Sequence, residues 1–432
     1  MRGSEGGGRF TRREWLLLAV LTAVQFCHVL DFVLVMPLGP MLMRSLRIGP
    51  QQFGMLVSAY TFSAALAGLA AAAFMDRFDR KRMLLGLMAG FGIGTLLCGL
   101  TEQYAFLIAA RIVAGAFGGV MAGVVFAIIG DQIRPERRGT ATGVVMASFS
   151  AASVLGLPFG LSLAEHSGWQ TPFLLLSAVT GLVLVFGLFA LPAMRAHVAP
   201  VREAGPFRGL WEVAREPRHL MAFGFTTAIM FSAFTVTPYL SPYLTRNVGV
   251  PETHLDLVYL AGGLATLVTG PVIGRLADRY GHARVFAAAA LLSIVPMLAV
   301  TNLPRVPLAV VLTVTSLMMV MGSGRMISAT ALLTGVVVPR HRGSFMSLNA
   351  SVQQGAAGLA TFVGGLVIAD GADGRLTRYP WVGALAVGAT LATLYLVTRL
   401  RTVAAAPALH YEAGAPPVAA PLEAPRHAAG AD

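Results

Sequence analysis

The sequence predicts an all-α membrane protein with twelve transmembrane helices in two pseudo-symmetric six-helix bundles. Of its 432 residues, 56% are hydrophobic and 12% are charged, and the mean hydropathy is +0.71. A soluble protein carries about 25% charged residues. A basic loop that begins at Asp76 returns at Asp278, and another that begins at Pro135 returns at Pro339, at nearly the same distance. Two loops duplicated at one spacing indicate two copies of one unit.

Twelve apolar segments make up most of the chain, and each is close to the ~20 residues that cross a hydrocarbon core as a helix. Lipid selects helices because they satisfy every backbone polar group internally. We expect spans at residues 15–38, 52–75, 83–101, 104–129, 140–163, 170–192, 219–244, 255–276, 285–302, 306–330, 345–369 and 380–399.

These spans group into two predicted bundles, residues 15–192 and 219–400. We expect a cytoplasmic N-terminal segment at 1–14 and a longer cytoplasmic connection at 193–218. Residues 402–432 are rich in Ala and Pro, and we expect a disordered cytoplasmic tail from residue 401 onward.

Basic residues indicate the orientation of the chain. The loops on the N-terminal side carry most of the 32 Lys and Arg residues, so the positive-inside rule places both termini in the cytoplasm and the protein in the inner membrane. The net charge of +12 does not indicate nucleic-acid binding, because the basic residues are scattered through short loops. Cys27 and Cys98 fall inside apolar spans and are expected to be free thiols.

The duplicated basic loop carries the first family resemblance. Its copies read Asp-Arg-Phe-Asp-Arg-Lys-Arg from Asp76 and Asp-Arg-Tyr-Gly-His-Ala-Arg from Asp278. With twelve spans in a 6+6 duplication, this pattern resembles the major facilitator superfamily, whose signature is Gly-x-x-x-Asp-Arg-x-Gly-Arg-Arg/Lys. The second copy keeps the family residues Gly274, Asp278, Arg279 and Gly281, and the first keeps Asp76, Arg77, Arg80 and Lys81. The first copy departs from the signature at Ala72 and Asp79.

The resemblance implies a major facilitator fold and a transporter whose two bundles rock about a cavity near the membrane midplane. It further implies that the loop at Asp76, Arg77 and Arg80 closes the cytoplasmic side, with Asp131 as its partner. The equivalent residues of the second half are Gly274, Asp278 and Arg279.

Three further stretches resemble proton-coupled exporters. Leu30-Asp31, followed by Pro37, resembles the acidic first-helix motif of drug:proton antiporters. Arg111, which begins Arg-Ile-Val-Ala-Gly, is similar to their buried-arginine motif. The stretch in span 140–163 resembles arabinose-efflux-permease-like and drug exporters, and its residues are Gly156, Pro158 and Gly160.

Asp31 is the one acidic residue deep in a predicted span. A carboxylate there costs roughly 2.5–3.5 kcal/mol on insertion scales and is a functional hypothesis by default. Burial favours its neutral form and a nearby arginine favours its charged form, so it can load and release a proton. His28 shares its helix face at i−3, and Arg111 lies at a matching depth. We expect these three residues to couple transport to protons; the alternative is a fixed structural ion pair.

Arg325 is the other buried charge, near mid-depth of span 306–330. We expect it to line the cavity and meet an anionic or strongly hydrogen-bonding substrate group, since a membrane arginine must face a cavity or a partner. The alternative is a partner in Asp31 or backbone carbonyls. Aromatic and polar residues complete the expected lining: Gln25, Tyr60, Phe231, Phe234, Tyr239, Gln353 and Gln354.

The motifs exclude several function classes. No Gly-x-x-x-x-Gly-Lys loop, His-Glu-x-x-His or Asp-Asp-x-x-Asp pattern is present, so we expect no enzyme activity, metal or cofactor, and a gradient as energy source. The sequence predicts a proton-coupled exporter of a small organic molecule (a drug, sugar or metabolite) that works as a monomer in the bilayer. The two buried arginines leave open a proton symporter or uniporter for a small organic anion.

Overall fold

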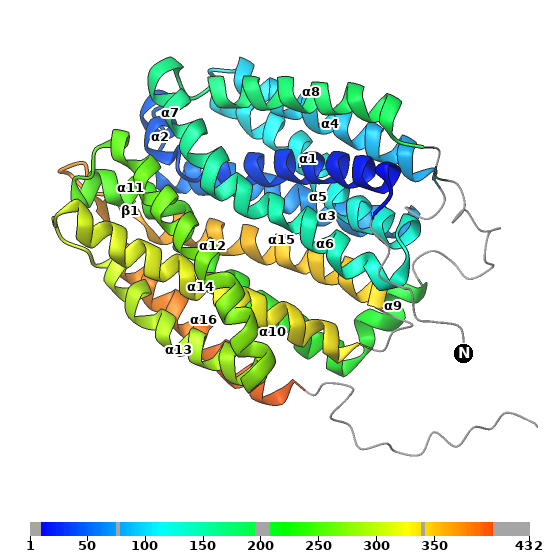
Figure 1. The fold of residues 1–432 in the computed structure, drawn as a ribbon. Coiled ribbons are helices and arrows are strands. Elements are labelled where there is room, and N and C mark those ends of the chain that lie inside the picture. Colours follow the sequence, from blue (N-terminus) through cyan, green and yellow to red (C-terminus); the bar gives the residue numbers. More distant parts are fainter. Residues whose placement is uncertain (1–9, 75–77, 193, 195–207, 338–341, 401–432) are drawn as a thin grey trace, which may run out of the picture.

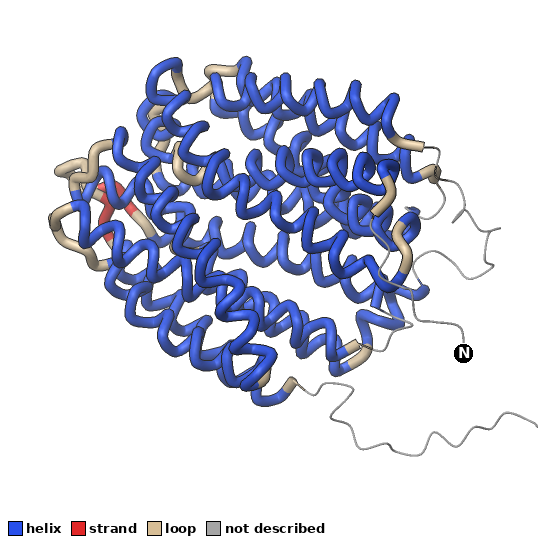
Figure 2. The backbone as a smooth tube through the Cα atoms, in the orientation of Figure 1, coloured by secondary structure: helices blue, strands red, loops and turns tan. Residues whose placement is uncertain are grey.

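A computed structural model describes residues 10–74, 78–192, 194, 208–337 and 342–400. In this part of the chain the long elements are helices, and the strands are the two-residue pair β1 (Ala369–Asp370) and β2 (Leu376–Thr377) (Figure 2). Asp76 and Arg77, two residues of the predicted cytoplasmic closure, lie outside the described residues.

Among the described residues, six membrane-length helical runs form the N-terminal bundle, and the fifth of them has three parts. The runs are α1 (Arg12–Leu34), α3 (Pro50–Phe74), α4 (Arg80–Leu100), α5 (Tyr104–Gln132), α6 (Arg138–Ala151) with η3 (Ala152–Gly156) and α7 (Leu157–Ser167), and α8 (Thr171–Ala190).

In the described part of the second half, six further long helices form the C-terminal bundle. They are α10 (Pro217–Phe234), α12 (Leu255–Tyr280), α13 (His282–Thr301), α14 (Leu308–Val336), α15 (Arg342–Val367) and α16 (Tyr379–Arg399). Among the described residues, eleven helices are long and apolar enough to cross a membrane. The twelfth long helix, α15, is less apolar because Asn349, Gln353 and Gln354 lie along it.

The same pairs of helices pack in both bundles, which confirms the predicted duplication. In the first bundle α3 and α4 both pack on α5, and α8 packs on α1 and α4. In the second bundle their equivalents α12 and α13 both pack on α14, and α16 packs on α10 and α13. Two copies of one unit therefore fold alike, although their sequences have diverged.

The two bundles meet through α3 and α15, which run side by side, and through α12, which packs on η3 and α7 (Figure 1). Small residues permit the close approach of α3 and α15. A Cβ on Gly54 would lie 3.3 Å from the Cα of Gly365, and the Ser58 hydroxyl donates a hydrogen bond to the Gly358 carbonyl at 2.9 Å. Such small-residue contacts drive helix association where no hydrophobic effect operates between helices.

Short elements mark the two ends of the molecule. We call the end that carries β1 and β2 the hairpin end, and the end at which α1 begins and α16 finishes the termini end (Figure 1). The hairpin end also carries α2 (Gly39–Ser45), η4 (Thr237–Tyr239), α11 (Leu240–Tyr243), η5 (Leu244–Val248) and η6 (Glu252–His254), and the termini end carries η2 (Pro135–Arg137) and α9 (Arg208–Arg215).

Side chains cap several helices at the termini end. The Thr11 hydroxyl accepts from the Glu14 amide, and the Glu14 carboxylate accepts from the Thr11 amide, a capping box that begins α1. Asp79, which replaces the glycine of the family signature, caps α4. The Lys81 ammonium donates to the Leu188 and Leu191 carbonyls where α8 ends. The departure from the family signature at Asp79 therefore has a structural role, because this side chain caps α4.

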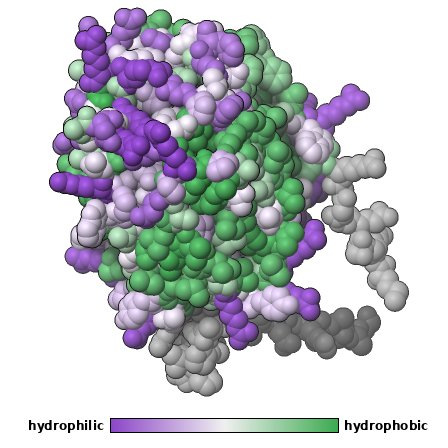
Figure 3. All heavy atoms as spheres, turned by 90° about the vertical axis from the view of Figure 1, so that its left-hand side faces the viewer, coloured by the Kyte–Doolittle hydropathy of each residue, from purple (hydrophilic) through white to green (hydrophobic). Residues whose placement is uncertain are grey.

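The outer surface carries large apolar side chains, as contact with lipid requires. Leu182 and Phe189 of α8 are 71% and 85% exposed, and Val268 of α12 and Val295 of α13 are each 69% exposed. Figure 3 views the hairpin end, where hydrophilic side chains gather beside a broad hydrophobic area. A water-soluble fold rarely leaves so many large apolar side chains uncovered.

Several predicted spans ended too early, among them the fourth and the tenth. We expected spans to end at residues 129 and 330, whereas α5 continues to Gln132 and α14 to Val336. Both helices run beyond their apolar stretch, where hydropathy no longer marks them but backbone hydrogen bonds continue. The predicted connection 193–218 contains α9, in which the buried Val213 packs on the C-terminal bundle.

Candidate functional site

The buried ion pair at the centre of the N-terminal bundle joins two residues singled out from the sequence. The Arg111 guanidinium of α5 donates to the Asp31 carboxylate of α1 at 2.8 Å. The Asp31 side chain is 0% exposed and that of Arg111 is 2% exposed. Among the described residues, this is the ion pair in which both side chains are almost fully buried. Burying it is favourable only when further hydrogen bonds satisfy both groups.

Two neighbours complete the surroundings of the pair. The Thr95 hydroxyl of α4 donates to the second Asp31 carboxylate oxygen at 3.2 Å. The ring of Tyr60, on α3, lies 4.2 Å from the Arg111 guanidinium carbon, a cation–π contact. Arg111 is therefore held between a carboxylate and an aromatic face. Sequence reasoning missed Thr95, although a hydroxyl at that depth of an apolar span was a usable signal.

His28 lies near the pair without bonding to it. Its ring packs against Phe91 at 6.4 Å, and neither of its buried ring nitrogens has a hydrogen-bond partner in the described part of the chain. The Gln25 side-chain oxygen and the Tyr60 hydroxyl are likewise buried without partners there. Gly118 lies between His28 and Tyr60, because a Cβ on it would be 3.0 Å from the His28 ring and 2.6 Å from the Tyr60 hydroxyl. His28 and Asp31 are both buried on α1, and His28 lies on the side of Gly118 and Tyr60.

The predicted helix-5 glycines lie against the first helix. A Cβ on Gly156 would come 2.8 Å from Leu30, and one on Gly160 would come 2.8 Å from Leu34. Pro158 lies at the start of α7, directly after the π-helical turn η3. Proline has no N–H and crowds the preceding turn, which explains why the helix widens there. Gly156 and Gly160 therefore permit the close approach of α1 and the fifth span.

The described part of the loops at the termini end shows one of the expected contacts. Arg80 of α4 donates to the carboxylate of Asp131, at the end of α5, at 3.1 Å. Both residues belong to the N-terminal bundle, so this pair joins neighbouring helices of one half. In the second copy, Asp278 is 78% exposed and approaches His282 at 3.7 Å, while Arg279 lies over the Tyr280 ring. Gly274 has open space beside it.

Arg325 lies inside the C-terminal bundle, where its guanidinium donates to the Ser293 hydroxyl of α13 at 3.3 Å. Two more of its nitrogens, Nε and Nη2, are buried without partners among the described residues. That Arg325 lines the cavity stays a prediction; in this structure its side chain is directed toward α13. Helix rotation decides the direction, because adjacent residues differ by about 100° around an α-helix.

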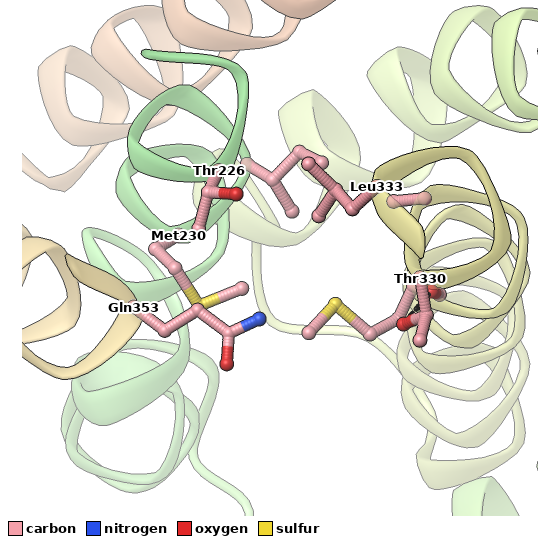
Figure 4. A pocket seen from close by; sticks show the side chains of 8 residues that line it. Thr226, Met230, Thr330, Leu333 and Gln353 are labelled. Atoms are coloured by element: carbon pink, nitrogen blue, oxygen red, sulfur yellow. Dashed lines mark hydrogen bonds between the residues drawn. The ribbon is translucent and has the colours of Figure 1, made fainter. Parts of the chain in front are cut away.

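A small pocket opens between α10, α14 and α15 of the C-terminal bundle (Figure 4). Gln353 and Met230 approach it from one side and Thr330 and Leu333 from the other. Among the described residues, no charged side chain lines this pocket. Its lining comprises Thr226, Ile229, Met230, Met326, Ala329, Thr330, Leu333 and Gln353.

Of the residues predicted to line a cavity, Gln353 lies in this pocket and the others lie elsewhere. Tyr60 covers Arg111 inside the N-terminal bundle. Tyr239 is fully buried near the hairpin end and donates to the Thr361 carbonyl at 2.6 Å. Gln25 faces the interior of the first bundle. The remaining members of the predicted set are half-buried: Phe231, Phe234 and Gln354.

A comparison with protein families matches the chain to the Major Facilitator Superfamily in two overlapping copies, at residues 21–239 and 222–427. Curated relatives include the uncharacterized MFS-type transporter YceJ of Bacillus subtilis, 27% identical over 65% of this chain and 70% of that protein. The multi-drug resistance efflux pump PmrA of Streptococcus pneumoniae is 28% identical over 62% of this chain and 69% of that protein. The putative transporter AraJ of Escherichia coli is 26% identical over 54% and 58% of the two chains.

Solved structures share the fold at low sequence identity. The nucleoside transporter NupG superposes with a TM-score of 0.72 at 13% identity, over 90% of this chain and all of that one. A bacterial homolog of the lysosomal transporter Spinster, in an inward-facing unoccupied conformation, gives 0.67 at 16% identity over 92% and 95%. The duplicated family match and the twelve-helix architecture agree. The chain belongs to the major facilitator superfamily and is a multi-pass membrane transporter, not an enzyme.

Proposed function

We propose that this transporter exports a small organic molecule in exchange for protons by alternating access. The observation that carries the proposal is the Asp31–Arg111 pair, which is closed off from solvent in the N-terminal bundle. A carboxylate at this depth is costly to insert and is retained where it serves transport. In this proposal the protein lies in the inner membrane, its termini end faces the cytoplasm, and a single chain is the working unit.

Proton coupling follows from the two states that Asp31 can adopt. When Asp31 is charged, Arg111 neutralises it at 2.8 Å. When Asp31 is protonated, Arg111 retains the Tyr60 ring but loses its ionic partner. A proton can shift a conformational equilibrium only if the two states bind it with different affinity. The two bundle arrangements would therefore differ in how closely Arg111 approaches Asp31.

The opening between α10, α14 and α15 measures about 10 Å³, which is the space of one water molecule, so a substrate would reach its lining only when the helices move apart. That lining favours a substrate that is largely apolar and uncharged. Met230 and Met326 offer flexible, polarizable surfaces that adapt to different shapes, while the Gln353 amide offers a donor and an acceptor. Efflux-named relatives such as PmrA support the outward direction of transport. An apolar, uncharged molecule that leaves the cell is therefore the substrate class that we propose.

Reconstitution in proteoliposomes with an imposed pH gradient tests the proposal. We expect Asp31→Asn to abolish gradient-driven transport while substrate binding persists and becomes nearly independent of pH. We expect His28→Ala to have a smaller effect, a shift of the pH optimum of transport. Asp373→Asn, at a 61% exposed position, is the control and should transport like the wild type. Uphill transport by Asp31→Asn at the wild-type rate would make a facilitator the better description.

One observation favours a second candidate, a symporter or uniporter for a small organic anion. Arg325 has two buried nitrogens without partners among the described residues, which an anion could satisfy. An anion would need a path to a side chain that points toward α13. A screen of neutral, anionic and cationic substrates separates the two candidates.

A further inference from the structure

Three aromatic rings form a continuous path from the buried ion pair to the opposite bundle. Phe32 directly follows Asp31 on α1. Its ring lies 5.8 Å from the Tyr60 ring, which covers the Arg111 guanidinium. On its other side the Phe32 ring lies 5.8 Å from the ring of Phe234, at the end of α10 in the C-terminal bundle. Both separations are within the range of favourable ring pairs.

Phe234 occupies a junction in the packing. The described apolar core divides into two clusters, a larger one that includes the N-terminal bundle and the hairpin end, and a smaller one inside the C-terminal bundle. The Phe234 side chain packs against both clusters. The contact between Phe32 and Phe234 therefore joins the core that holds the ion pair to the core that holds the pocket.

The backbone at Phe234 is also tied to the helix pair that joins the bundles. α10 ends at this residue, and the Thr361 hydroxyl of α15 donates to the Phe234 carbonyl at 3.3 Å. A Cβ on Gly364 would lie 2.8 Å from the Thr235 carbonyl oxygen, so α15 has little room to move independently. Because α15 packs along α3, a displacement of Phe234 would reach the interface between the bundles.

We propose that Phe32 is a positioning residue that transmits the charge state of Asp31 to the bundle interface. Protonation of Asp31 releases Arg111, and the Tyr60 ring beneath the guanidinium readjusts. Phe32, wedged between Tyr60 and Phe234, then changes the contact between α1 and α10. Chains of packed side chains with two discrete arrangements can carry such coupling. The inference rests on the proposed proton coupling and adds the route by which coupling reaches the second bundle.

This role predicts uncoupling, which differs from a loss of binding. Phe32 is not among the residues that line the pocket, so its truncation should leave substrate affinity within about twofold. We expect Phe32→Ala to reduce proton-driven accumulation about tenfold. Downhill exchange of the same substrate should persist. Phe32→Tyr keeps the ring and should restore accumulation.

The experiment compares uphill accumulation with downhill exchange in proteoliposomes, and measures how pH changes distances between spin labels on the two bundles. Phe32→Ala should flatten the pH response of these distances, and Phe234→Ala should flatten it to the same extent. The double variant should show no larger effect than either single variant, because both residues act in one contact. Phe26→Ala, which truncates an earlier phenylalanine of α1, is the control and should retain coupling. If the space left by the missing ring prevents Phe32→Ala from folding, Phe32→Leu, which fills more of that space, is measured in its place.

The outcomes separate the two proposals. If Phe32→Ala transports uphill at the wild-type rate and its spin-label distances respond to pH as in the wild type, the proposed role of Phe32 is overturned and the proposed function stands. Equal losses of uphill and downhill transport would also overturn it, because they indicate a merely structural contact. A wild type that never accumulates substrate against its gradient would overturn the proposed function and this inference with it.

Discussion

Arg44 and Glu252 join the two bundles at the hairpin end through a two-pronged ion pair. The Arg44 guanidinium on α2 donates to both Glu252 carboxylate oxygens, at 2.8 and 2.9 Å. Arg44 belongs to the first half of the chain, and Glu252 begins η6 in the second half. The Arg44 side chain is 67% exposed, so the pair contributes little to folding. Because the pair connects the two halves of the chain, it opposes their separation at the hairpin end.

We predict that Glu252→Gln shifts the protein toward states in which the hairpin end is open. Loss of one exposed pair is worth up to about 1 kcal/mol, which corresponds to a change of about fivefold in the equilibrium. Labelling of cysteines introduced at the hairpin end of α3 should rise accordingly. Asp373→Asn is the control, because the Arg375–Asp373 pair at 3.5 Å lies within the β1–β2 hairpin. The charge swap Arg44→Glu with Glu252→Arg should restore wild-type labelling; failure to do so would argue against a gate.

The two adjacent glutamines of α15 should differ in their effect on substrate binding. Gln353 lines the pocket, whereas Gln354 is not among its lining residues. Gln353→Ala removes a hydrogen-bonding group worth about 1 kcal/mol and should weaken binding about fivefold. Gln354→Ala should bind like the wild type in a direct binding assay. Equal effects of the two substitutions would place the substrate elsewhere.

Replacing Arg325 by methionine should spare the transport of an uncharged substrate. The arginine points to Ser293 on α13 and carries a buried charge without an acidic partner among the described residues. An apolar residue of similar length avoids the cost of burying that charge, so thermal stability should hold or rise. Transport assays with neutral and anionic compounds provide the check. Selective loss of anion transport in Arg325→Met would favour the symporter or uniporter.

Two glycines on α4 should respond oppositely to alanine. A Cβ on Gly94 would lie 2.6 Å from the Ala114 backbone nitrogen of α5, whereas a Cβ on Gly86 meets open space. Gly94→Ala should destabilise the protein by about 1–3 kcal/mol through overpacking. Gly86→Ala should leave stability unchanged or raise it by about 0.5–1 kcal/mol, as alanine loses less backbone entropy. Thermal unfolding in detergent measures both, and a stable Gly94→Ala would mean that α4 and α5 can move apart.

The sequence by itself determined the spans, the duplication and the depth of the buried charges. Hydropathy reports which segments can enter lipid, and the repeated loops report that two halves share one fold. Depth along a helix follows from residue number, because each residue adds about 1.5 Å. For this reason the sequence alone predicts that Asp31 and Arg111 lie at similar depths and can meet.

Only the tertiary structure decided which side chains meet. An apolar helix surrounded by lipid and protein has little amphipathic pattern, so its rotation is not readable from hydropathy, and rotation turned Arg325 toward Ser293. Thr95 reaches Asp31 and Phe32 reaches Phe234 from helices distant in sequence. Arg44 meets Glu252 because α2 and η6 come together at one end of the bundles. These contacts depend on helix packing angles and on close approach at small residues, which depend on the whole assembly of helices.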